Sequence, residues 1–223
     1  MAATIDGPRL EPRSGQARQL VVFLHGYGAD GNDLIDIGRA WQQALPDAAF
    51  VSPHAPEPCG MAPVGRQWFA LTMRDPRERW TGVNKAAPIL NAFLDAELAR
   101  RKLPDSALAL VGFSQGTMMA LHVGLRRRGA PAAIVGYSGL FVLPGQEPAA
   151  AAPEITARPP ILLIHGDSDD LIPPQALFQS AQWLAALDIP VEWHLSQGIG
   201  HGIDGEGLRH GGEFLIRRLG RSR

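Results

Sequence analysis

Short apolar runs alternate with amphipathic segments along most of this chain. Runs with the length and composition of buried strands lie at 20–24, 48–51, 108–111, 133–137, 161–164 and 191–195. Between several of them, apolar side chains recur every three or four positions, the spacing of one helix face. Two such faces are formed by Leu177, Ala181 and Leu184 and by Ile89, Leu90, Phe93, Leu94 and Leu98. Because strands that alternate with helices build βαβ units, the pattern predicts the α/β class, with a mostly parallel central sheet and helices on both faces.

Glycine-rich polar segments directly follow four of these runs. They lie at 25–28, 112–116, 165–170 and 198–202. The carboxyl ends of parallel strands share one edge of a sheet, and ligands bind in the crevice beyond that edge. We therefore expect the functional residues at this edge, although the four segments are far apart in the sequence.

The segment Gly112-Phe113-Ser114-Gln115-Gly116 has the spacing of a nucleophile elbow. A serine hydroxyl is a weak nucleophile at neutral pH. A sharp strand-to-helix turn presents it to a base, and small flanking residues let other backbone segments come close. A serine that only caps the following helix would be the simpler explanation. The strand pattern before the segment and the helix pattern after it favour Ser114 as a nucleophile.

Such a nucleophile needs a histidine base, and His201 is the best candidate. It lies in a glycine-flanked loop after a strand, downstream of the acidic segment 165–170. His194 lies inside a strand pattern and His210 on an expected helix, and His122 lies on the apolar helix after Ser114. These three histidines are better explained as packed or solvated side chains.

A carboxylate would complete the constellation, and Asp167, Asp169 and Asp170 all lie in one turn. One of them would hold the imidazole. The others would fix the loop through hydrogen bonds to its backbone, as aspartates in turns commonly do. Spacing alone leaves the choice among the three open. The chain order of serine, acid and histidine is that of α/β-hydrolases and differs from the order in chymotrypsin or subtilisin.

The charge composition of the chain argues against nucleic acid and anionic membranes as binding partners. The chain has 21 basic and 22 acidic residues, so its formal charge of −1 gives no field that would attract nucleic acid or an anionic membrane. We find neither an integral membrane segment nor the apolar core of a secretory signal, and we expect a cytoplasmic protein of one domain, residues 1–223. A single cysteine, Cys59, excludes an intrachain disulfide. Outside the segments above no spacing is typical of metal ligands, so we expect neither a metal nor another cofactor.

These motifs together resemble the carboxylesterase, lysophospholipase and acyl-protein thioesterase family of α/β-hydrolases. The resemblance runs nearly end to end and is carried by segments 24–28, 112–116 and 165–169 and by Gly200-His201. It implies that Asp169 is the acid and that the backbone N–H groups of Tyr27 and Gln115 receive the oxyanion. It also implies hydrolysis of small acyl esters through an acyl-enzyme on Ser114. Acyl thioesters or lysophospholipids are the alternative substrates, and a non-catalytic binding module on the same fold is the alternative of another class.

An acyl chain needs an apolar wall, and residues 53–83 supply aromatic and sulfur-containing side chains beside a proline-rich stretch. We expect this segment to be an insertion that forms a lid or acyl pocket, although simple coverage of the core would explain the same side chains. The candidates for substrate contact are Trp68, Leu71, Met73, Trp80, Leu140 and Phe141. Tryptophans exposed beside such a lid would also suit a homodimer interface.

Overall fold

A seven-stranded sheet lies at the centre of the computed structural model, which describes residues 4–60, 62, 64–72, 75, 77–145 and 147–220. Its strands are β1 Arg9–Leu10, β2 Gln19–Leu24, β3 Ala48–Val51, β6 Leu108–Phe113, β7 Ala133–Tyr137, β8 Ile161–Gly166 and β9 Val191–Ser196. Their spatial order is β1-β3-β2-β6-β7-β8-β9, and all neighbours are parallel except β1 and β3. Each of the six apolar runs expected from the sequence is confirmed as a strand, while the short β1 was not predicted.

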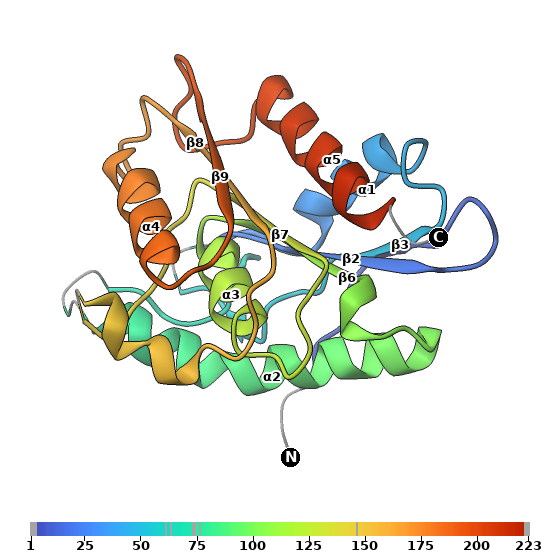
Figure 1. Cartoon of the computed structure of the whole chain (residues 1–223), viewed down its shortest axis with the longest axis horizontal. Helices are drawn as coiled ribbons and strands as arrows, with labels where there is room; N and C mark the ends of the chain where they lie inside the picture. Colours follow the sequence, from blue (N-terminus) through green and yellow to red (C-terminus); the bar gives the residue numbers. More distant parts are fainter. Residues whose placement is uncertain are drawn as a thin grey trace.

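Helices cover both faces of this sheet (Figure 1). They are α1 Asn32–Trp41, α2 Glu78–Arg101, α3 Gln115–Gly124, α4 Gln175–Ala186 and α5 Gly205–Leu219. Helices α1 and α5 share one apolar cluster with Val21 and Phe23, whereas α2, α3 and α4 share another with Leu20 and Val22. Successive side chains of a strand point to opposite faces, so the fully buried β2 contributes to both clusters. The predicted α/β class is confirmed.

The expected helix faces are also present. Helix α4 buries Leu177, Ala181 and Leu184, and α2 buries four of the five positions expected for it, with Ile89 half-buried. Helix α2 begins at Glu78, so the last part of the predicted 53–83 insertion is the start of a core helix.

Shorter elements complete the described chain. Before α2 it forms a small antiparallel pair, β4 Glu57–Pro58 with β5 Arg66–Gln67. Short 3-10 helices lie at η1 Asp105–Ala107, η2 Pro148–Ala150 and η3 Ala152–Glu154. The sequence pattern predicted none of these elements, because they are too short to show a period.

The tryptophans beside the predicted lid are less exposed than the sequence analysis expected. Beside the predicted lid, Trp68 is 1% exposed and Trp80 is half-buried, whereas Trp193 on β9 is 53% exposed. The expected tryptophan surface beside the lid is therefore not formed by these two side chains.

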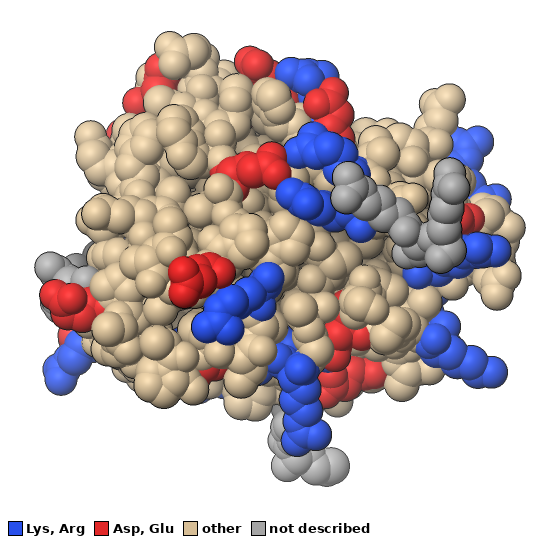
Figure 2. Space-filling view, viewed as in Figure 1, with Lys and Arg blue, Asp and Glu red and all other residues tan. Residues whose placement is uncertain are grey.

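On the face shown in Figure 2, basic side chains lie among acidic ones, as a net charge near zero would suggest. Within the described part of the chain, no helix combines the length and the apolar character needed to cross a bilayer.

His122 lies on α3 and its side chain is buried in the core, as the sequence suggested. It is 2% exposed, and its ring packs edge-on against Trp80 with 5.5 Å between the centroids. Among the described residues, its Nδ1 has no hydrogen-bond partner. Burial, aided by the positive charge of Arg126, lowers the pKa of His122 to about 3. The folded protein therefore holds this imidazole neutral well below pH 6.

This buried histidine predicts a specific acid sensitivity. In the unfolded chain His122 takes up a proton near pH 6.5, but in the folded protein only near pH 3, so its contribution to stability is complete above pH 6.5 and is lost as the pH falls toward 3. Between pH 7 and pH 5 the wild type should lose about 2 kcal/mol more unfolding free energy than His122→Leu. Urea unfolding across this range measures the difference. Parallel curves for the two proteins would contradict the assignment.

Candidate active site

A cavity of about 1200 Å³ lies at the carboxyl ends of the strands. Its described lining comes from the segments after β2, β6, β8 and β9, from residues between 67 and 72, and from Gly60 and Arg79. Ser114, His201, Tyr27 and Gln115 all contribute to it, and Asp169 is buried behind His201. The structure thus brings together residues from four distant loops at the edge of the sheet where the sequence placed them.

Ser114 has a backbone conformation that side-chain-bearing residues rarely adopt. Its φ of 53° and ψ of −114° occur at the step from β6 into α3. Its N–H donates to the carbonyl of Tyr137 at 2.9 Å, and its own carbonyl accepts from the N–H of Thr117 at 3.0 Å. Conformations of this kind cost about 1–3 kcal/mol and persist only where their surroundings hold them. The sharp strand-to-helix turn expected at 112–116 is therefore present, with its serine at the cavity.

Glycines on either side of Ser114 allow three backbone segments to meet at this turn. A Cβ atom at Gly112 would overlap the backbone of Gly116 and Thr117, and one at Gly116 would overlap the carbonyl of Leu24. Because neither position has a side chain, the first turn of α3 can lie directly against the end of β2. This contact brings the start of α3 to the loop that follows β2.

The imidazole of His201 is held by Asp169. The His201 Nδ1 lies 2.7 Å from Oδ2 of Asp169, whose side chain is 0% exposed. The other carboxylate oxygen accepts from the N–H groups of Leu171 at 3.0 Å and Ile172 at 2.9 Å. Burial by itself raises the pKa of Asp169, but the hydrogen bonds from Ile172 and His201 outweigh it and hold the pKa below its usual value. An ionised carboxylate only accepts, so Nδ1 donates and the Nε2 of a neutral His201 carries the lone pair.

The three aspartates of this turn, which spacing could not separate, have different surroundings. Asp167 accepts from the Ser168 hydroxyl at 2.8 Å and from the N–H of Gly198 at 2.7 Å. Asp170 is exposed. Asp169 is the one that contacts His201, whereas Asp167 joins its own turn to the loop that carries His201.

His165 is a part of this arrangement that the sequence analysis did not single out. Its buried Nε2 lies 2.8 Å from the carbonyl of Ile172 and 3.1 Å from Oδ2 of Asp169. A carbonyl oxygen can only accept, so this nitrogen carries a proton that the carboxylate can share. Its position at the start of the acidic segment 165–170 was the available signal.

The loop after β2 and the start of α3 bring Tyr27 and Gln115 to the cavity. Gln115 is the first residue of α3, and the N–H groups of a first helical turn have no partner within the helix. His25 fixes the turn before Tyr27. Its Nε2 accepts from the N–H of Ala55 at 2.9 Å, and its Nδ1 lies 2.8 Å from the carbonyl of Gly26. Burial lowers the pKa of His25, so the neutral ring keeps its proton on Nδ1.

The side chain of Gln115 has a second role in positioning these loops. Its oxygen accepts from the N–H of Trp68 at 2.9 Å, and its nitrogen donates to the carbonyl of Phe69 at 2.8 Å. The Trp68 indole in turn donates to the carbonyl of His25 at 3.0 Å. Trp68 therefore supports the site from behind and does not line the cavity, contrary to its predicted contact with substrate.

Of the other residues predicted to contact substrate, some line the cavity and others pack in or against the core. Leu71 lines the cavity, whereas Met73 lies outside the described residues. Trp80 packs against α3, Phe141 is buried in the core and Leu140 packs against that core. None of these last three belongs to the described cavity lining.

Other apolar side chains form the cavity wall. They are Leu34, Met118, Leu171, Ile172 and Ile203, together with Phe113 of the elbow. Leu171 stands out among them because it is exposed at the rim. The sequence analysis missed this wall because it comes from four separate segments, each with an ordinary apolar pattern of its own.

Comparison with known proteins agrees with this architecture. Residues 6–217 match the family model described as Phospholipase/Carboxylesterase. Esterase YpfH of Escherichia coli is 27% identical over 86% of this chain and 80% of its own length. Acyl-protein thioesterase 1 of Schizosaccharomyces pombe is 30% identical over 74% of each chain. The crystal structure of esterase PE8 has a TM-score of 0.92 and 44% identity, and the match covers 97% of this chain and 100% of that one.

The match to the family model spans nearly the whole chain, and so does the structural match to esterase PE8. The chain therefore belongs to the phospholipase/carboxylesterase family of α/β-hydrolases and is a serine hydrolase that acts on ester bonds.

Proposed function

We propose that this protein hydrolyses small carboxylic esters, with Ser114 as nucleophile, His201 as general base and acid, and Asp169 as the residue that orients the imidazole. The observation that carries the proposal is the 2.7 Å contact between His201 and Asp169 beside the cavity that Ser114 also lines. This contact holds the proton on Nδ1 and leaves Nε2 free to take one from a hydroxyl. Every role in the proposed reaction is filled by a side chain or a backbone N–H group of this chain or by water.

The reaction has two balanced halves. Ser114 Oγ attacks the acyl carbon while His201 Nε2 takes the hydroxyl proton, and the N–H groups of Tyr27 and Gln115 stabilise the oxyanion. The ester C–O bond then breaks as His201 returns the proton to the leaving alcohol, and the acyl group stays on Ser114. A water molecule, deprotonated by His201, then attacks the acyl carbon. The bond from this carbon to Ser114 Oγ breaks as His201 returns the proton to Oγ, which releases the carboxylic acid and free Ser114.

The cavity supports an acyl substrate. Its wall is largely apolar, and a smaller number of polar residues, Ser114 and His201 among them, complete it. This is the usual composition of a site for an apolar ligand. Esterase PE8 shares more of its sequence with this chain than do the two relatives described above, so an oxygen ester is the favoured substrate. Acyl thioesters are the second candidate, because acyl-protein thioesterase 1 of Schizosaccharomyces pombe is also similar to this chain.

A fluorophosphonate probe tests the chemistry directly, because it forms a covalent bond only with an activated serine. We expect one adduct per chain, located on Ser114 by mass spectrometry, and none in folded Ser114→Ala. Hydrolysis of p-nitrophenyl esters of graded acyl length, beside an acyl thioester and a lysophospholipid, then defines the substrate. Folded wild-type protein without a Ser114 adduct would refute the mechanism and favour a non-catalytic binding module.

The two neighbouring aspartates allow a matched test of the acid. Asp169→Asn should lower kcat for a p-nitrophenyl ester by about 10⁴-fold, because an amide at this position can hold the wrong imidazole tautomer. Asp170→Asn changes an exposed carboxylate one residue away and should leave kcat within about threefold of wild type. Steady-state kinetics at pH 8 separates the two. Equal losses in both variants, or a larger loss in Asp170→Asn, would overturn the assignment of Asp169.

A further inference from the structure

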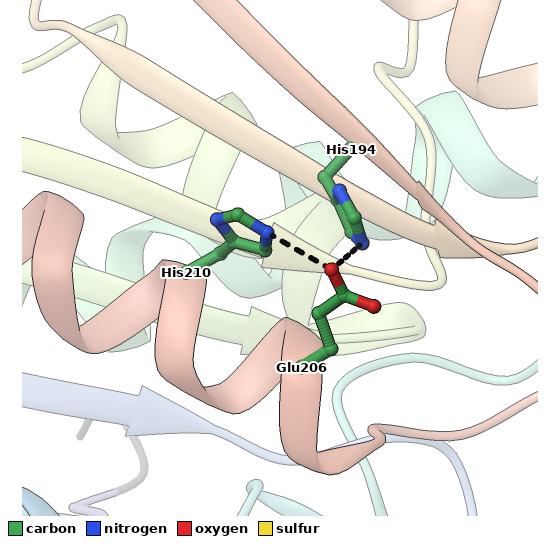
Figure 3. A group of neighbouring side chains, drawn as sticks. All are labelled: His194, Glu206 and His210. Atoms are coloured by element: carbon green, nitrogen blue, oxygen red, sulfur yellow. Dashed lines mark ion pairs between the residues drawn. The ribbon is translucent and has the colours of Figure 1, made fainter.

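A second group of side chains with metal-ligand chemistry lies between β9 and α5. His194 on β9 faces Glu206 and His210 of α5, and Figure 3 shows both rings directed toward the Glu206 carboxylate. The Oε1 of Glu206 lies 3.6 Å from Nε2 of His210 and 4.0 Å from Nε2 of His194. One ligand atom from each residue can be chosen so that all three lie within 4.8 Å of one another. We propose that these three residues bind a divalent transition metal ion of the zinc class.

The fold makes this grouping specific. Glu206 and His210 are four residues apart and so lie on one face of α5, one turn from each other. Alternate residues of β9 point toward the same helix. Glu192 pairs with Arg217 and Arg218 near the end of α5, while Ser196 donates to Asp204 before its first turn, and His194 lies between these two contacts. The two histidines and the glutamate therefore meet at the middle of one strand-to-helix contact.

The nitrogens are suited to bind a cation. The guanidinium of Arg209 lies 3.3 Å from Nε2 of His210, and because it can only donate, this nitrogen accepts and carries a lone pair. Nε2 of His194 is buried and, among the described residues, has no hydrogen-bond partner. A metal ion between the rings would give the His194 nitrogen a partner and would replace Arg209 at the His210 nitrogen.

The geometry fits zinc after small side-chain rotations. Zinc binds imidazole nitrogen and carboxylate oxygen at about 2.0–2.2 Å, and a tetrahedral arrangement then places ligand atoms about 3.4 Å apart. The Glu206 oxygen lies 3.6 and 4.0 Å from the two nitrogens and needs to approach each by well under an ångström. The third separation, between the ligand atoms of the two histidines, lies within 4.8 Å and needs to shorten by at most about 1.4 Å. Two imidazoles and one carboxylate favour zinc, cobalt or nickel over the harder magnesium and calcium ions. The half-exposed Glu206 leaves room for water as a fourth ligand.

One competing cation must move for the ion to enter. Arg209 lies 3.9 Å from Oε1 of Glu206, but it also holds Glu213 at 2.9 Å. It can keep the Glu213 contact while its second nitrogen leaves the His210 ring. Arg209 therefore weakens metal binding without blocking it.

A metal ion here would clamp the two ends of the loop that carries His201. This loop joins β9 to α5 and is otherwise held by contacts such as Ser138 to the carbonyl of Gly202 at 3.0 Å and Asp167 to the N–H of Gly198 at 2.7 Å. The ion would therefore stabilise the protein at a point outside the catalytic cavity. Its effect is expected on unfolding and not on the chemical step.

Calorimetric titration of the full-length, tag-free protein with Zn²⁺ tests the proposal. We expect one ion per chain and a Tm that rises with Zn²⁺ concentration, as linkage requires of a ligand that binds the folded state. His210→Ala and His194→Gln should each weaken binding more than tenfold, whereas Glu192→Gln, which changes a partly exposed carboxylate of β9 that pairs with Arg217 and Arg218, should not weaken it. Arg209→Ala should bind more tightly than wild type, because the competing cation is gone.

Loss of binding in a folded variant supports the site, and circular dichroism and Tm without metal establish that each variant is folded. Zinc affinity that is unchanged in both His210→Ala and His194→Gln would overturn the proposal, since the ion would then bind elsewhere, for example beside His201. Absence of binding by the wild type at millimolar Zn²⁺ would overturn it equally.

Discussion

The contact between the first turn of α3 and the end of β2 is the constraint on which the site depends. Gly116 lies against the carbonyl of Leu24, and Gly112 lies against the backbone of Gly116 and Thr117. This approach forces the chain to turn sharply at Ser114, which then adopts a φ of 53°. The strain is offset by the burial of α3, whose residues are all buried. Packing in the core thus fixes the position of the reactive hydroxyl.

Hydrogen bonds then align the other loops with that turn. The side chain of Gln115 joins α3 to the backbone of Trp68 and Phe69, and the Trp68 indole reaches the carbonyl of His25. On the other side, Asp169 receives two backbone amides and the His201 ring. Each loop is held by groups from another loop, so the arrangement exists only in the folded chain.

The sequence predicted much of this because its strongest signals are local. Continuous apolar runs marked six strands, and the glycine-rich segments after them contain Ser114, Asp169 and His201. The residues of the cavity wall and the hydrogen bonds that hold the loops in place were harder to predict from the sequence. Trp68 has the composition of a substrate contact, yet its environment is set by a glutamine 47 residues away. Likewise, His194 and His210 look ordinary in strand and helix patterns, and only the pairing of β9 with α5 brings them together.

The stability and probe reactivity of Gly116→Ala test the central claim most directly. The added methyl group would overlap the carbonyl of Leu24 and push α3 away from β2, whereas Gly205→Ala adds the same group where nothing lies within 4 Å. We predict that Gly116→Ala loses about 2–3 kcal/mol of unfolding free energy and, while still folded, reacts with a fluorophosphonate at least tenfold more slowly. Gly205→Ala should match the wild type. Wild-type stability and reactivity in Gly116→Ala would contradict the account.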